Sequence, residues 1–263
     1  MSGYWALVSA HLRTELQYRA AAIAGMVTQL VFGLIIVGIY RAFYSSAVSP
    51  QPMALRDVIT YVWLGQALLR MLPWNVDREL RLLIRSGGVA YEMLRPLDLY
   101  SAWYCRALAW RAAPTLLRAL PMVAIAMPLL GMQPPASLTA GLACAAAIGG
   151  ALLLGCAITT LMNISLLWTV SGDGISQLVP VLVVVLSGMA LPLPLFPAWA
   201  QPLLRVLPFA GLVDTPFRLY VGHLPVSQLP SLLAHQLAWS AALILLGRWV
   251  LARGLRRLVV QGG

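Results

Sequence analysis

The acidic residues of this chain are too few and too dispersed to form a catalytic pair. Asp and Glu together number 8 among 263 residues. They are Glu15, Asp57, Asp77, Glu79, Glu92, Asp98, Asp173 and Asp214. Only Asp77 and Glu79 are close in sequence, and residues two apart on a helix do not share a face. The acids therefore predict neither a general acid–base pair nor a carboxylate metal cluster.

The other residue types that carry chemistry are missing or isolated. The Lys and Arg total of 18 is made up of arginine alone, so the chain has no lysine. A phosphate-binding P-loop needs the lysine of G-x-x-x-x-G-K-[ST], and a Schiff base needs a lysine amine. His11 and His223 have no partners at ligand spacing, and the three cysteines form no metal motif. We expect no catalytic residue, metal or cofactor in this chain, and any ATP that drives it must bind to another subunit.

The composition is that of an integral membrane protein. The chain is 60% hydrophobic and 10% charged, with a mean hydropathy of +0.83. Crossing a bilayer takes about 20 apolar residues in a helix. We predict an all-α membrane protein with one domain and six transmembrane helices. The expected spans are 20–40, 58–72, 112–131, 138–170, one ending near 193, and 230–251.

The segments between the spans differ in character. Residues 1–19 predict an amphipathic helix in the membrane interface, and 20–72 hold the first two spans. A charged segment covers 73–111, and spans three to five lie within 112–193. The proline-rich segment 194–228 is too apolar for an exposed loop, so it predicts re-entrant or interfacial half-helices. Residues 229–263 hold the sixth span and a basic tail.

Arginine placement predicts the orientation. Only Arg41, Arg56, Arg205 and Arg218 fall on the outer side if both termini are cytoplasmic. Cytoplasmic segments carry the excess of basic residues, so this orientation is expected, with membrane lipids as contacts of the arginines. A basic face with interleaved aromatics, as in soluble nucleic-acid-binding domains, is absent, so no nucleic acid is expected as a partner.

Two details inside the apolar and charged segments predict local structure. In the fourth span, small residues recur every four positions, which lets helices approach closely: Ala143, Ala147, Ala151, Gly155 and Thr159. In the charged segment, Gly87 and Gly88 are expected to end one helix, and "AYEMLRP" to form a second that stops before Pro96. Pro114, Pro121 and Pro128 are expected to kink or shorten the third span.

The order of these parts resembles that of an ABC type-2 permease. Two stretches carry the resemblance: "IRSGGVAYEMLRPLDLYSAWYCR" (84–106) and "LPLPLFPAWAQPLLRVLPFAGLVDTPFRLYVG" (191–222). The first is similar to the coupling segment of the branch in which separate six-span permeases pair. The second is similar to the "fP-x-W … lPF … P … G" pattern before the last span of that family.

The resemblance implies a non-catalytic membrane subunit of an ATP-driven exporter. It implies a pathway at the interface with a second permease, identical or different, and a separate ABC ATPase subunit that binds ATP and Mg²⁺. The coupling helix between spans two and three would meet that ATPase through Arg85, Gly87, Gly88, Tyr91, Glu92 and Arg95. The alternative is that these charges solvate a loop and anchor it to lipid headgroups.

Four polar residues near or inside the spans have two interpretations each. Arg70 is expected to reach the inner interface or to face the pathway. Asn163 and Ser165 are expected to bond between helices or to line the pathway. Asp173 is expected to cap the fifth span or to form a second cytoplasmic contact.

Two other function classes remain as alternatives. A membrane-embedded lipid-modifying enzyme would need the clustered acids that the chain lacks, and a passive channel or scaffold would show a polar stripe along one helix. Abundant Ala, Gly, Pro and Arg without Lys are typical of GC-rich bacterial genes. The expected location is therefore a bacterial cytoplasmic (inner) membrane. No pattern indicates the transported substrate.

Overall fold

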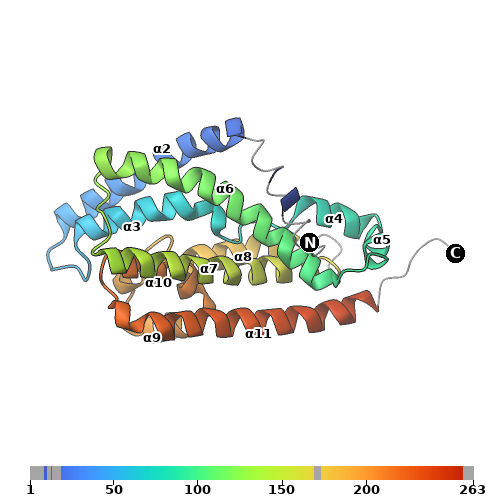
Figure 1. Ribbon diagram of the computed structural model, residues 1–263. Helices are drawn as coiled ribbons and strands as arrows, with labels where there is room; N and C mark the ends of the chain where they lie inside the picture. Colours follow the sequence, from blue (N-terminus) through green and yellow to red (C-terminus); the bar gives the residue numbers. More distant parts are fainter. Residues whose placement is uncertain (1–8, 11–12, 14–18, 169–172, 257–263) are drawn as a thin grey trace.

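The computed structural model describes residues 9, 10, 13, 19–168 and 173–256, and every regular element among them is helical. The long helices run along a common direction and form an elongated bundle (Figure 1). The amphipathic helix predicted for residues 1–19 lies almost wholly outside the described residues. The fold class expected from the composition, an all-α protein, is confirmed for the part of the chain that is described.

Within the described ranges, four helices are long and apolar enough to cross a membrane. They are α2 (Arg19–Ser46), α6 (Leu99–Leu129), α7 (Leu138–Ser165) and α11 (Leu229–Leu255). The second and fifth expected spans correspond to α3 (Leu55–Leu68) and α8 (Asp173–Leu186), of 14 residues each. A helix of that length measures about 21 Å, less than the roughly 30 Å of a hydrocarbon core. The structure thus shows four candidate spans of the six expected.

The third expected span is longer than the sequence pattern predicts. Helix α6 begins at Leu99, inside the segment assigned to the charged loop, and continues through Pro114, Pro121 and Pro128 to Leu129. Proline removes one backbone hydrogen bond, but apolar helices tolerate that loss where neighbouring groups satisfy the freed carbonyl. Of the two effects expected of these prolines, a kink or a shortened span, the shortening is not found, and the charged segment ends in a helix shared with the span.

Helix α8 ends earlier in the chain than the sequence pattern predicts. It stops at Leu186, seven residues before the expected limit near Leu193. Gly188 follows with φ of +88°, in the left-handed region that glycine adopts without a steric penalty. Ser187 is buried, and its carbonyl oxygen accepts a hydrogen bond from the amide of Asp214, 3.1 Å away. The chain therefore turns at Gly188 into the proline-rich segment.

Helix α7 lies at the centre of the bundle against α6, α10 and α11. Its predicted stripe of small residues is buried along its whole length. Gln236 of α11 is fully buried, and its amide nitrogen donates to the carbonyl oxygens of Ala147 at 2.9 Å and Gly211 at 2.7 Å. A Cβ on Gly150 would lie 2.1 Å from the Gln236 Oε1. Small residues on α7 therefore make room for the polar contact with α11.

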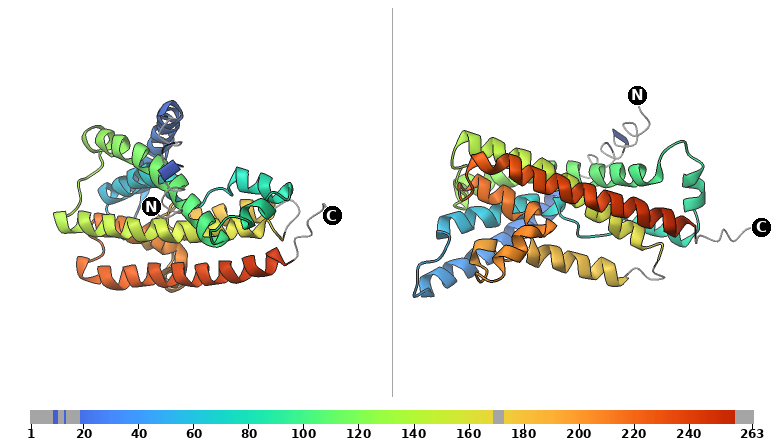
Figure 2. Two further views of the ribbon diagram at one scale, coloured as in Figure 1. Left: turned by 45° about the vertical axis from the view of Figure 1, so that its right-hand side comes forward. Right: turned by 90° about the horizontal axis from the view of Figure 1, so that it is seen from below.

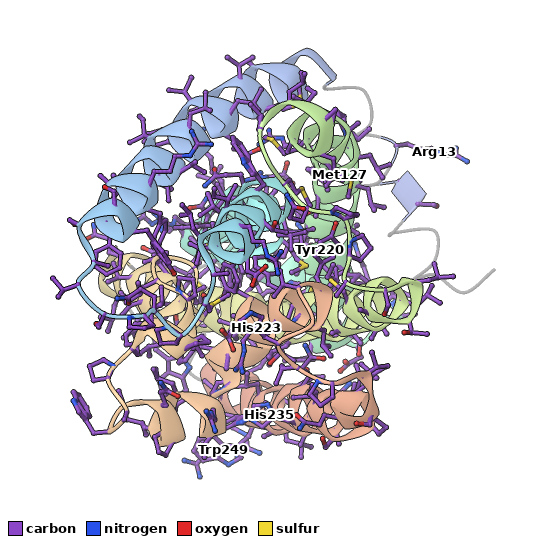
Figure 3. All side chains as sticks on the ribbon, turned by 90° about the vertical axis from the view of Figure 1, so that its left-hand side faces the viewer. Arg13, Met127, Tyr220, His223, His235 and Trp249 are labelled. Atoms are coloured by element: carbon purple, nitrogen blue, oxygen red, sulfur yellow. The ribbon has the colours of Figure 1, made fainter. Side chains whose placement is uncertain are left out.

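The proline-rich segment folds into short helices at one end of the bundle. They are η2 (Leu193–Leu195), α9 (Gln201–Val206), η3 (Pro208–Leu212), α10 (Asp214–Tyr220) and η4 (Val226–Gln228). Of these, η3 and α10 are almost entirely buried. This end faces the viewer in Figure 3, where Tyr220 lies among the helices; its hydroxyl donates to the carbonyl of Gln133 at 3.1 Å.

A buried carboxylate holds this segment together. Asp214 is 3% exposed and accepts hydrogen bonds from the amide of Leu193 at 3.2 Å and the hydroxyl of Tyr61 at 3.4 Å. Arg218, one turn later on α10, donates to its other oxygen at 3.3 Å. These contacts join η2, α10 and α3, so irregular backbone here is satisfied inside the protein.

Candidate coupling site

The charged segment forms two short helices at the end of the bundle opposite the proline-rich segment. Helix α4 (Arg78–Arg85) and helix α5 (Val89–Met93) lie beside the C-terminal end of α11 in both views of Figure 2. Gly87, with φ of +73°, separates them, in agreement with the sequence pattern. Asp77 caps α4 by accepting from the amides of Glu79 at 2.9 Å and Leu80 at 3.2 Å. We call α4 and α5 together the coupling module, after the role that the resemblance of this segment implies.

An ion-pair network fastens the coupling module to α6. Arg106 of α6 donates to both carboxylate oxygens of Asp77 and to Glu79. The Arg106 and Asp77 side chains are only 16% and 11% exposed. Charge-assisted hydrogen bonds with restricted access to water are stronger than surface ion pairs. The start of α4 is therefore tied to a long helix.

Helix α7 supplies a second attachment. Asn163 is 1% exposed, and its side-chain oxygen accepts a hydrogen bond from the backbone amide of Asp77 at 2.8 Å. An apolar cluster fills the space between the coupling module and the ends of α6, α7 and α11. Its buried members are Leu80, Val89, Tyr100, Trp103, Ile164 and Leu251. The coupling module thus packs on three long helices at once.

Helix α5 has its own tie to α6. The indole nitrogen of Trp103 donates to a carboxylate oxygen of Glu92 at 2.9 Å. Trp103 is 1% exposed and Glu92 is half-buried. Of the six residues expected to meet an ATPase, Glu92 is therefore engaged inside the protein through one of its oxygens.

The remaining predicted coupling residues lie on the outer side of the coupling module. Arg85, Gly87 and Arg95 are exposed, Tyr91 is 77% exposed, and Gly88 is half-buried. Leu94, which the sequence pattern did not single out, is 81% exposed. Exposed apolar residues beside charges form the kind of surface that a partner protein covers.

The structure places the other predicted polar residues as follows. The Arg70 guanidinium lies over the Trp110 ring, 5.2 Å from its centroid, at the boundary between η1 and α6. Ser165 donates to the carbonyl of Met162 at 2.6 Å within α7. Asp173 is the first residue of α8, and its side chain lies outside the described part of the chain.

The sequence pattern assigned no role to Asp77, Arg106 or Arg111, although all three lie in the charged segment. Arg111 is 3% exposed and donates to the carbonyl of Leu72, with Met71 O at 3.4 Å. Those carbonyls follow the end of α3, where Pro73 prevents the helix from continuing. Pro73 in the sequence indicates that carbonyl oxygens before it need a donor, but only the burial seen in the structure identifies Arg111 as that donor.

Gly87 allows a direct test of the turn between α4 and α5. A Cβ at this position would have no heavy atom within 4 Å, so only the positive φ opposes it. We expect Gly87→Ala to lower the free energy of unfolding by about 1 kcal/mol. Gly149 in α7 also has open space around it but helical backbone, so Gly149→Ala should leave stability unchanged or raise it. Thermal unfolding of both variants measures the difference, and equal effects would contradict the role of φ.

Taken together, the apolar bundle and the coupling module define a polytopic helical membrane protein whose charged helices are rigidly joined to its long helices. The family model described as ABC-2 family transporter protein matches residues 30–262, which is most of the chain. The chain belongs to this family and is a membrane permease subunit of an ABC transporter. No curated protein and no solved structure matches it. Permeases of the family work with ABC ATPase partners.

Proposed function

We propose that this chain is the membrane-spanning subunit of an ATP-driven exporter in a bacterial cytoplasmic membrane, and that the coupling module receives force from a separate ATPase. The observation that carries this proposal is the two-sided character of α4 and α5. Their inner side is bound to α6, α7 and α11, while Tyr91, Leu94 and Arg95 are exposed on the outer side. ATP and Mg²⁺ bind to the partner, because the chain has no lysine for a P-loop.

Force transmission follows from the attachments of the coupling module. Closure of an ATPase dimer displaces α4 and α5, and the bonds of Asp77 to Arg106 and Asn163 pass this displacement to α6 and α7. Small displacements at such a joint become rigid-body rotations of packed helices. A rotation of this kind alternates access between the two sides of the membrane.

Six membrane crossings with both termini in the cytoplasm complete the proposed topology. Helix α3 and helix α8 are short, but each is extended by other structure: η1 (Leu69–Met71) follows α3, and the buried turn at Gly188 follows α8. This topology puts the coupling module on the cytoplasmic side and the proline-rich segment on the outer side, in accord with arginine placement.

The pathway is proposed to run along a groove between α2, α3 and α8, closed by a second permease. The groove has a volume of about 740 Å³ and a mainly apolar lining. Gln29 and Gln66 lie in it, 6% and 4% exposed, and the Gln29 side-chain oxygen accepts no hydrogen bond within the described residues. These glutamines join Asn163 and Ser165, which make hydrogen bonds to the Asp77 amide and the Met162 carbonyl, as candidates for the pathway.

Purification in mild detergent tests the proposal. We expect the permease to co-purify with a soluble ATPase that contains a P-loop, and ATP hydrolysis by the complex to fall at least tenfold in the Arg95→Glu variant. Glu92→Gln is the companion variant in α5: it removes the charge of Glu92, while the glutamine side-chain oxygen still accepts the hydrogen bond from Trp103. Arg56→Glu is the control on the opposite end of the bundle. A permease purified alone, or hydrolysis unaffected by Arg95→Glu, would count against the proposal.

A further inference from the structure

A basic cavity lies between the coupling module and the bundle. It has a volume of about 600 Å³, within the usual range for ligand sites. Arg78, Arg81 and Arg85 of α4 form one wall, Trp110 of α6 a second, and Ser176 of α8 a third. The cavity therefore brings together three guanidinium groups, a hydroxyl and an indole from three separate helices.

The charged side chains that line this cavity, among the described residues, are all positive. Its lining, among the described residues, contains no Asp or Glu. The nearest acids along α4, Asp77 and Glu79, are held by Arg106. The guanidinium of Arg70 lies over the Trp110 ring, 5.2 Å from the ring centroid, and adds a further positive charge. The surroundings thus favour an anion with several acceptor oxygens.

We propose that this cavity binds the phosphate of an anionic phospholipid headgroup from the inner leaflet. Guanidinium groups bind phosphate oxygens in pairs with defined geometry, and basic pockets between membrane helices on the cytoplasmic side take such headgroups. Arg81 donates to the Ser176 hydroxyl at 3.4 Å, so the wall contributed by α4 is already oriented toward α8. This inference rests on the orientation in the proposed function.

Apolar surface next to the cavity distinguishes a lipid from a free phosphate. Leu82 lines the cavity and is 58% exposed. Acyl chains would cover Leu82 while the headgroup contacts the arginines. A bound lipid would then link α4 to α8, which the Arg81–Ser176 hydrogen bond also joins.

Lipid binding by the purified permease tests this inference without an ATPase or a transport assay. Thermal unfolding in micelles is followed while phosphatidylglycerol, phosphatidylcholine or inorganic phosphate is added. Of these three additives, we expect only phosphatidylglycerol to raise the unfolding temperature. Its binding should be about fivefold weaker in Arg78→Gln and about 25-fold weaker in Arg78→Gln/Arg81→Gln. Arg256 is exposed and directly follows the last residue of α11, so Arg256→Gln is the control and should bind as the unchanged chain does.

Each other result would overturn the inference. A shift with inorganic phosphate alone would make the ligand a free anion. Unchanged lipid affinity in the Arg78→Gln variant would place lipid binding elsewhere. Arg78 is exposed and this variant keeps the Arg81–Ser176 contact, so it can be measured even if the double variant fails to fold. A loss of lipid affinity in Arg256→Gln equal to that in Arg78→Gln would mean that the arginines attract anionic lipid without a specific site. A separate co-purification with the ATPase serves as a further check: if the arginine variants keep lipid binding but no longer form the complex, the cavity is a site for the partner protein.

Discussion

Replacing Asp77 with alanine is expected to lower the free energy of unfolding by about 3–5 kcal/mol. The change removes the cap of α4 and the buried one of the two carboxylates that pair with the Arg106 guanidinium, 16% exposed, so that only the 72% exposed Glu79 remains. Breaking a buried pair by removing one member is costly because the remaining charge is not compensated. Denaturation of the purified permease in mixed micelles measures the loss, and ATP hydrolysis by the complex should fall with it.

Asp98 supplies the matched control. It caps α6 through the amide of Ser101 at 2.9 Å and pairs with Arg248 at 3.3 Å, but both charged side chains are about half exposed. Asp98→Ala should therefore cost only about 1 kcal/mol. Equal losses in the two variants would contradict the conclusion that the Asp77 network, rather than helix capping, attaches the coupling module.

The second large effect is expected at Asp214. Asp214→Ala removes the acceptor of Tyr61 and of the Leu193 amide, and it leaves Arg218, 17% exposed, unpaired. We expect a loss of about 3–5 kcal/mol in the free energy of unfolding, together with faster proteolysis of the segment between α8 and α11. Both are measured on the purified permease by denaturation and by mass mapping of the cleavage sites.

Two further variants separate the contributions at Asp214. Asp214→Asn keeps the Oδ1 acceptor for Tyr61 and Leu193 but removes the charge, so it should lose less than alanine does. Arg205→Ala changes an exposed arginine at the same end, which donates a hydrogen bond to the side-chain oxygen of Gln201 at 3.1 Å. It should alter stability by less than about 0.5 kcal/mol. A loss from Arg205→Ala as large as that from Asp214→Ala would contradict this account.

Local patterns in the sequence predicted much of the helical organisation. The Gly87-Gly88 pair marks the break between α4 and α5, because glycine adopts the positive φ found at Gly87. The small residues of α7 are buried as their spacing of four indicates. The proline-rich segment forms short helices, of which η3 and α10 are buried, since its residues are apolar yet cannot extend one helix. Each of these signals resides in neighbouring residues.

Contacts between distant segments could not be predicted in the same way. Asp77 and Arg106 are 29 positions apart and Asp77 and Asn163 are 86 apart, so no periodicity relates them. The length of α6 was misjudged because residues 99–111 were assigned to the charged segment, whereas the helix already begins at Leu99. Arg111 was treated as one more charge of the loop, although burial makes it a donor to the end of α3.

Cross-linking between the coupling module and the ATPase tests the central claim most directly. A photoreactive amino acid replaces Tyr91, 77% exposed on α5, or Val48, fully exposed in the loop before α3. The permease is co-expressed with the ATPase that purifies with it, and the complex is irradiated. Tyr91 is predicted to form a covalent adduct with the ATPase, and Val48 is predicted to form none. An adduct from Val48, or none from Tyr91 in an active complex, would contradict the account.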